Sequence, residues 1–247
     1  MHVPDTQPVH LAPLAIRLAT TRRDAAASAW LRDALASIRT TVGGSTRPLR
    51  LALARSRRLL GLDPLHPTAA ERDAMPPSVE ARLSTPGWRL LDVGRAALVL
   101  TALETLPPAD GAELFGDLLR RGELSEQESL LRMLPLLPHG RTLLDGAVEA
   151  GRTNALPVFA AIALHNPYPA QWFPDLNFNQ LVLKAMFMGL PVDHVEGLPG
   201  RASDELARMV LGYASEREAA GRSIPAGVQH IVALANQSEN PPQTAAR

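Results

Sequence analysis

The residues best suited to binding chemistry lie in the C-terminal third of the chain. Six of the ten aromatic residues fall between Tyr168 and Tyr213, and the same stretch contains Lys184, the single lysine among 25 basic residues. It follows His165-Asn166-Pro167-Tyr168-Pro169, in which two prolines restrict the backbone. A lysine is a compact charge whose pKa can fall on burial, whereas arginine stays charged. The segment therefore predicts a rigid aromatic loop followed by helices that carry polar side chains.

Two helices expected in this segment each carry a cation on an otherwise apolar surface. At 100° per residue, Asn177, Gln180 and Lys184 lie within about 60° of one another on a helix over residues 175–189. On a helix over residues 203–220, Arg217 projects into the apolar face. Helices that are apolar all round are buried, and an unpaired buried charge costs several kcal/mol. Both cations are therefore predicted to point inward, toward acceptors.

Two interpretations of these inward cations remain open. One is an internal salt-bridge network with Glu205, Glu216 or Asp175. The other is a pocket in which charge-assisted hydrogen bonds hold a phosphate or carboxylate. The candidate ligand-binding residues are His165, Tyr168, Asn177, Gln180, Lys184, Arg201, Tyr213 and Arg217.

No familiar catalytic or cofactor motif occurs in the chain, so the catalytic residues are unknown and no cofactor is predicted. The nucleotide-binding glycine patterns, G-x-S-x-G and H-E-x-x-H are all absent. No two of the seven histidines have metal-ligand spacing on one helix, and no metal site is predicted. The absence of cysteine excludes disulfides, a cysteine nucleophile and thiolate zinc sites.

The elements that must position these residues are all helices. Apolar stretches long enough for several helical turns end at Pro, Gly or Asn, and no segment of real length alternates with period two. Ser84-Thr85-Pro86 predicts a helix start, and Ser125 with Glu128 predicts a capping box. The sequence predicts an all-α fold, either a multi-helix bundle or an irregular HEAT-like solenoid of antiparallel helix pairs. Most of the chain is expected to be helical.

Composition divides the chain into regions. Residues 1–9 and 237–247 are predicted to be disordered tails, 10–61 to form Arg-rich helices, 62–78 a proline-rich linker and 79–236 the main helical domain. The formal net charge is zero, which argues against a nucleic-acid partner. The longest apolar run is too short to span a bilayer and no signal peptide is visible, so a cytoplasmic location without membrane insertion is expected.

Several widely spaced motifs resemble the EboA-domain family. They are the His165–Pro169 loop, Asn179–Phe187, Gly197-Leu198, Arg201-Ala202, Glu205–Met209, Tyr213–Arg217 and Ala220–Arg222. The resemblance covers the segment 165–222 strongly and the segment 86–164 in helical texture, and the segment 1–80 does not contribute. It implies a bacterial or algal gene cluster with a UbiA-type prenyltransferase, a sugar-phosphate-cyclase-like protein, a TatD-like hydrolase, and TIM-barrel and phosphatase-like proteins. Such clusters are associated with making or exporting a specialised metabolite.

Three classes of function follow. The leading prediction is a helical binding or accessory protein in the assembly or trafficking of a specialised metabolite, with a pocket for a small anion and with proteins of the same cluster as partners. The alternative is an enzyme acting on a phosphorylated or otherwise anionic intermediate, with His165 or Tyr168 moving a proton. The weakest is a nucleic-acid or membrane-surface adaptor that uses the Arg-rich segment 1–60, because the arginines there are mixed with apolar helix faces and no aromatic stacking platform interleaves them.

Overall fold

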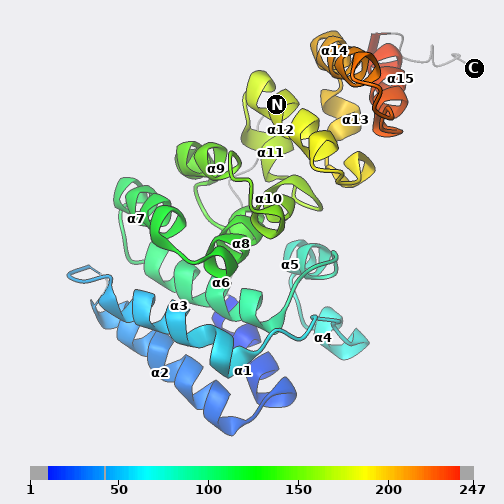
Figure 1. Ribbon diagram of the computed structural model, residues 1–247. Helices are drawn as coiled ribbons and strands as arrows, with labels where there is room; N and C mark the ends of the chain where they lie inside the picture. Colours follow the sequence, from blue (N-terminus) through cyan, green and yellow to red (C-terminus); the bar gives the residue numbers. More distant parts are fainter. Residues whose placement is uncertain (1–10, 42, 240–247) are drawn as a thin grey trace, which may run out of the picture. The chain divides into compact units, whose positions relative to one another are not determined.

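A computed structural model describes residues 11–41 and 43–239 (Figure 1). It is 74% helical, with 15 α-helices and no strands among the described residues, which confirms the all-α prediction. The expected tail over residues 1–9 and most of that over 237–247 lie outside the described residues. Residues 237–239 belong to the last helix.

Two compact units make up the chain, an N-terminal unit of Met1–Ile162 and a C-terminal unit of Ala163–Arg247. The expected linker at 62–78 does not coincide with this division. It contains α4 (Ala69–Asp73) and the start of α5 (Pro77–Leu83). Leu65 in this segment is buried and its backbone N–H donates to the Trp88 carbonyl at 2.7 Å. Buried apolar side chains and a paired backbone thus attach this segment to the N-terminal unit.

The N-terminal unit is built around one buried helix, α6 (Leu90–Leu103). Residues 90–102 are all buried, and α6 packs against α1 (Leu11–Arg22), α2 (Ala25–Thr41) and α3 (Arg47–Leu60), as Figure 1 shows. A Cβ at Gly94 would overlap with Cδ1 of the buried Leu60, so glycine here lets α3 and α6 approach closely without displacing that leucine.

The rest of the unit consists of shorter helices. α7 (Pro108–Arg121) packs against α8 (Leu124–Met133) and α9 (Leu144–Ala150). The 3₁₀ turns at Leu134–Leu136 and Gly140–Leu143 connect α8 to α9, and α10 (Leu156–Ala163) follows.

Two helix starts differ from the predicted ones for a local reason. α6 begins at Leu90 rather than at Pro86, because the Asp92 carboxylate accepts a hydrogen bond from the Arg89 backbone N–H at 2.9 Å, while Ser84 ends α5. α8 is capped by Glu123, whose backbone N–H donates to the Glu126 carboxylate at 3.3 Å, and not by Ser125. A carboxylate three residues into the helix is the common element of both starts.

The C-terminal unit contains α11 (Tyr168–Trp172), α12 (Asp175–Phe187), α13 (Leu198–Arg201), α14 (Asp204–Ala219) and α15 (Gly227–Glu239), with a 3₁₀ turn at Val192–His194. α14 packs against both α12 and α15 (Figure 1). Ser203 caps α14, since its hydroxyl accepts from the Leu206 N–H at 3.3 Å. These five helices, with the loop before α11, position all the candidate residues.

Candidate functional site

The polar side chains of α12, Asn177, Gln180 and Lys184, are accessible to solvent and do not lie in the interior of the C-terminal unit. Gln180 is exposed, and Asn177 and Lys184 are half-buried. At 100° per residue, Leu176, Gln180 and Phe187 share one face within about 40°. Leu176 is 60% exposed and Phe187 is 70% exposed. The expectation that α12 is buried on all sides is wrong, because the other packed helices leave this face uncovered.

Lys184 lies at the border between the exposed and buried faces of α12. Its neighbours on the buried side, Leu181 and Ala185, are covered. Burial lowers the pKa of the Lys184 ammonium because the charged form loses hydration. A positive charge that has lost part of its hydration gains most from an anion placed beside it.

Arg201 joins three helices at one end of the C-terminal unit. Its Nη1 donates to the Ala170 carbonyl at 2.5 Å and its Nη2 to the Phe173 carbonyl at 2.9 Å. Nη2 also lies 2.9 Å from Asp175 Oδ1, and the guanidinium lies 4.6 Å from the centre of the Phe178 ring. The side chain therefore satisfies the carbonyls that α11 leaves open at its C-terminus.

Arg217 is held at the C-terminal end of α14. Its Nε donates to the Ser223 carbonyl at 2.6 Å and its Nη1 to the Tyr213 hydroxyl at 3.2 Å. The guanidinium also lies 5.7 Å from the Tyr213 ring centre. Arg217 thus has the acceptors that the sequence required, and they are a carbonyl and a hydroxyl.

Two of the three carboxylates named for an internal network pair with arginines other than Arg217. Asp175 pairs with Arg201, whereas Glu205 pairs with Arg208 at 2.6 Å on the outside of α14. One cation of the candidate set therefore meets one of the expected acids, and it does so at the start of α12.

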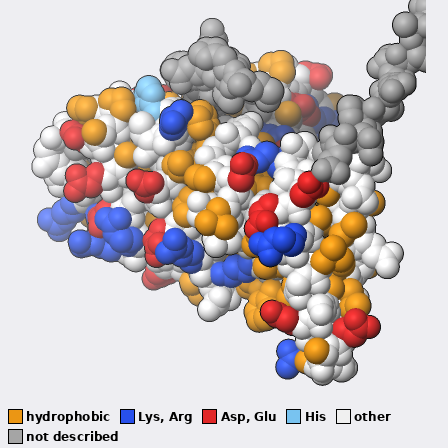
Figure 2. All heavy atoms as spheres, turned by 90° about the horizontal axis from the view of Figure 1, so that it is seen from above, with side chains coloured by type: hydrophobic (Ala, Val, Ile, Leu, Met, Phe, Trp, Pro, Cys, Tyr) orange, Lys and Arg blue, Asp and Glu red, His pale blue; other side chains and the backbone are white. Residues whose placement is uncertain are grey.

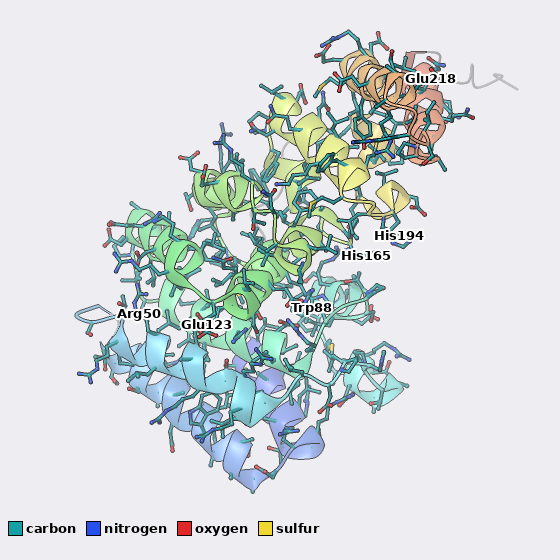
Figure 3. All side chains as sticks on the ribbon, in the orientation of Figure 1. Arg50, Trp88, Glu123, His165, His194 and Glu218 are labelled. Atoms are coloured by element: carbon teal, nitrogen blue, oxygen red, sulfur yellow. The ribbon has the colours of Figure 1, made fainter. Side chains whose placement is uncertain are left out.

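The loop before α11 brings two histidines into ring contact (Figure 3). The His165 and His194 ring centres are 4.6 Å apart, and the His165 backbone N–H donates to the His194 carbonyl at 2.9 Å. His165 has a left-handed backbone with φ of 52°. Burial, and secondarily the nearby His194, lower the pKa of His165, so the neutral base is favoured.

Tyr168 is the first residue of α11, so the expected loop over residues 165–169 already turns into a helix at this position. It is 1% exposed, its ring meets Phe173 edge-to-face at 6.2 Å, and its backbone N–H donates to Asn166 Oδ1 at 3.1 Å. Tyr168 is therefore a buried core residue and does not contribute to the exposed face of α12.

A second polar cluster, in the N-terminal unit, was not predicted from the sequence. The Asp92 carboxylate, fully buried on α6, accepts from Arg89 at 2.9 Å, from Ser129 Oγ at 2.6 Å and from Arg132 at 3.3 Å. Arg95 is 2% exposed and donates to Ser129 Oγ at 3.0 Å and Ser56 Oγ at 2.9 Å. Burial lowers the pKa of Arg95. In the sequence, the signal for this cluster is that Asp92 and Arg95 lie one helical turn apart in the largely apolar segment 90–103.

Two further features are absent from the part of the chain that the structure describes. Among the described residues, no group of three or more His, Asp or Glu side chains is placed to hold a metal ion. Within the same residues, no helix combines the length and the hydropathy needed to cross a bilayer.

The fold and the site together define a class of all-helical protein whose C-terminal unit carries aromatic side chains and the candidate cations. Charges of both signs are intermixed on the surface seen in Figure 2. A family model described as metabolite traffic protein EboA matches residues 14–233, and the chain belongs to this EboA family. The match therefore begins near the N-terminus, in a region where no individual motif was visible. Searches of curated proteins and of solved structures returned no match.

Proposed function

We propose that this chain is a metabolite-binding accessory protein that takes part in moving a specialised metabolite between other proteins. The family description, metabolite traffic protein, supports the general role. The observation that carries the binding role is the exposed apolar face of α12, with Leu176 at one end, Phe187 at the other and Lys184 at its border. Leu176 and Phe187 lie three helical turns apart on this face, with the exposed Gln180 and the half-buried Leu183 between them. Exposed apolar surface that is rimmed by polar groups is typical of binding sites.

The chemistry of this face favours an amphipathic anion. Leu176 and Phe187 offer apolar contacts to the body of a ligand, and Lys184 offers a partly dehydrated positive charge to its head group. Asn177 and Gln180 add hydrogen-bonding groups beside the lysine. Of the other candidates, Arg201 supports this surface by joining the end of α11 to Asp175 at the start of α12.

The test uses dodecanoate, below its micelle concentration, as the amphipathic anion. Isothermal titration should show binding of dodecanoate, and weaker or no binding of acetate and of dodecyltrimethylammonium. Lys184→Met and Phe187→Ser should each weaken dodecanoate binding by about tenfold, the effect of about 1.4 kcal/mol.

Two matched controls separate this face from the rest of the surface. Leu124→Ser removes a leucine on α8 that is 59% exposed, and Arg141→Met removes an exposed cation. Both should leave the dissociation constant unchanged. Equal binding of dodecanoate to Lys184→Met, Phe187→Ser and the unmodified chain would refute the proposed face.

Binding of the chain to partner proteins is tested by a separate measurement. Native mass spectrometry of the chain with the products of neighbouring genes should show a stoichiometric complex, and a ligand-sized mass should be present on the chain before mixing. A complex that forms equally with and without ligand would favour a scaffold over a carrier.

The contact between His165 and His194 favours a second candidate, an enzyme acting on a phosphorylated or otherwise anionic intermediate. A neutral His165 is suited to accept a proton, while Lys184 would hold the phosphate. Turnover of such an intermediate that is lost in His165→Asn, with the fold retained, would establish the enzyme. Binding without turnover supports the carrier.

A further inference from the structure

A cavity of about 480 Å³ lies between α7, α8 and α9 of the N-terminal unit, and no role has been assigned to it. Its volume is within the ~300–1,000 Å³ range of small-molecule sites. Gly116 and Leu119 of α7, with Gly146 and Ala150 of α9, supply small and apolar surface. Gln127 and Thr153 add polar groups to the lining. This combination is typical of ligand pockets rather than of a packing defect.

Gly146 is not required by the packing of the two helices. A Cβ placed there would meet Gly116 Cα at 3.5 Å and Leu119 Cδ1 at 3.6 Å, which are ordinary contacts. Alanine stabilises a helix relative to glycine. A glycine in a helix where alanine fits keeps the space open at a cost in stability, and the space it keeps open is the cavity.

Gly116 has a different role in the same cavity. A Cβ at this position would lie 3.2 Å from Nη1 of Arg120, so the guanidinium lies back over the glycine. Arg120 therefore lines the cavity although its side chain is 64% exposed. Its carboxylate neighbour, Asp117 at 3.8 Å, also pairs with Arg121 at 2.7 Å. The ion pair between Arg120 and Asp117 is therefore long, and Asp117 has a closer partner in Arg121.

The charges that line the cavity are balanced. Arg152 and Glu149 pair with each other at 3.3 Å. Arg120 and Asp145 provide one further charge of each sign, and Asp145 makes none of the ion pairs found among the described residues. A ligand with one net charge would be attracted by one of these side chains and repelled by the other. A ligand that carries both charges complements both.

We propose that this cavity binds a small zwitterion with an apolar body, its carboxylate toward Arg120 and its ammonium toward Asp145. The apolar body lies over the surface formed by Gly116, Gly146 and Leu119. The site is separate from the α12 face and takes a different class of ligand, so the chain carries two kinds of small-molecule site.

The test is isothermal titration of the full chain with L-leucyl-L-leucine. N-acetyl-leucyl-leucine, which lacks the ammonium, and leucyl-leucine amide, which lacks the carboxylate, should each bind about tenfold or more weakly than the zwitterion. Arg120→Met and Asp145→Asn should abolish this preference. Equal binding of the three peptides, or no binding of any at millimolar concentration, would overturn the proposal.

Gly146→Ala gives a readout that misfolding cannot imitate. The added methyl should raise Tm by about 2–4 °C while weakening dipeptide binding by about tenfold or more. Gly212→Ala is the matched control, because Gly212 lies in α14 with no atom within 4 Å of an added Cβ. It should raise Tm similarly and leave dipeptide binding unchanged. Unchanged binding in Gly146→Ala would refute the site.

A second control, Arg121→Met, removes a neighbouring arginine that pairs with Asp117 but does not line the cavity. It should leave dipeptide binding unchanged, and a loss equal to that of Arg120→Met would contradict the assignment. Gly146→Ala should not alter dodecanoate binding, nor Phe187→Ser dipeptide binding. Failure of one site is therefore distinguishable from failure of the other.

Discussion

The two units place their arginines in different environments. In the N-terminal unit, Arg89 and Arg132 meet the fully buried carboxylate of Asp92, and the buried Arg95 reaches it through Ser129. In the C-terminal unit, Arg201 and Arg217 bind backbone carbonyls near helix ends while remaining partly exposed. The first arrangement joins helices distant in sequence through the core, and the second closes the ends of helices from outside.

The energetic consequences of these environments differ in size. Removing one partner from a buried ionic cluster leaves the remaining charges with little hydration, and without Asp92 the guanidinium groups of Arg89 and Arg132 retain only Glu128 as a counter-charge among the described residues. Removing a partly exposed arginine leaves carbonyl groups that water can still reach. The comparison therefore predicts large losses of stability in the N-terminal cluster and smaller ones in the C-terminal unit.

The largest effect is expected for Asp92→Ala. Without the carboxylate, Arg89, Arg132 and Ser129 lose their common acceptor, and the free energy of unfolding should fall by about 3–5 kcal/mol. Urea denaturation followed by circular dichroism measures this change. If the variant does not fold, Arg132→Met, which retains the Arg89 contact, provides a milder version of the same test.

The control is an exposed ion pair in the same unit. Glu149 pairs with Arg152 at 3.3 Å, with both side chains 69% exposed, and Glu149→Ala should cost less than about 1 kcal/mol. Equal losses for Asp92→Ala and Glu149→Ala would show that burial does not set the energy of these contacts.

An intermediate effect is expected for Arg201→Met. The variant leaves the Ala170 and Phe173 carbonyls and the Asp175 carboxylate without this donor, for a loss of about 1.5–3 kcal/mol. Thermal denaturation should show this loss, whereas Arg208→Met, which removes an exposed pair with Glu205, should leave Tm unchanged. An unchanged Tm in Arg201→Met would mean that this arginine is available to a ligand instead.

The smallest effect is a change in pH dependence caused by His165. Because burial and His194 lower its pKa, the unfolded chain takes up a proton near pH 6.5 before the folded chain does. Stability should therefore decrease as the pH falls through about 6.5, until the lower folded-state pKa is passed. The other charged groups facing His165 are Asp193 and Glu196, and both oppose the shift.

His165→Asn removes this proton uptake, and asparagine tolerates the left-handed backbone at this position. Urea denaturation at pH 7.5 and pH 5.5 should show a smaller loss of stability in the variant than in the unmodified chain. His230→Asn, an exposed histidine on α15, should retain the full loss. An identical pH dependence in His165→Asn would contradict the assignment to His165.

Much of the fold follows from local sequence signals. The apolar helical period and the Pro, Gly and Asn breaks correctly predict α12 and α14 within two residues at each end. The short helices α4 and α13 were missed, because four or five residues contain too few apolar positions to show a period. The candidate residues of the C-terminal unit were found from their composition, while the pocket they were predicted to form remains a prediction.

The sequence by itself determined the helical class, the family and the identity of the residues with chemistry to offer. Tertiary structure decided which face of α12 is left uncovered, which carbonyls Arg201 and Arg217 bind, and that Asp92 and Arg95 share Ser129 of α8 as a partner. The physical reason is the distance along the sequence over which the interactions act. Helix formation depends on residues three or four positions apart, whereas burial and ion pairing depend on neighbours such as Ser56 and Ser129, 39 and 34 positions from Arg95.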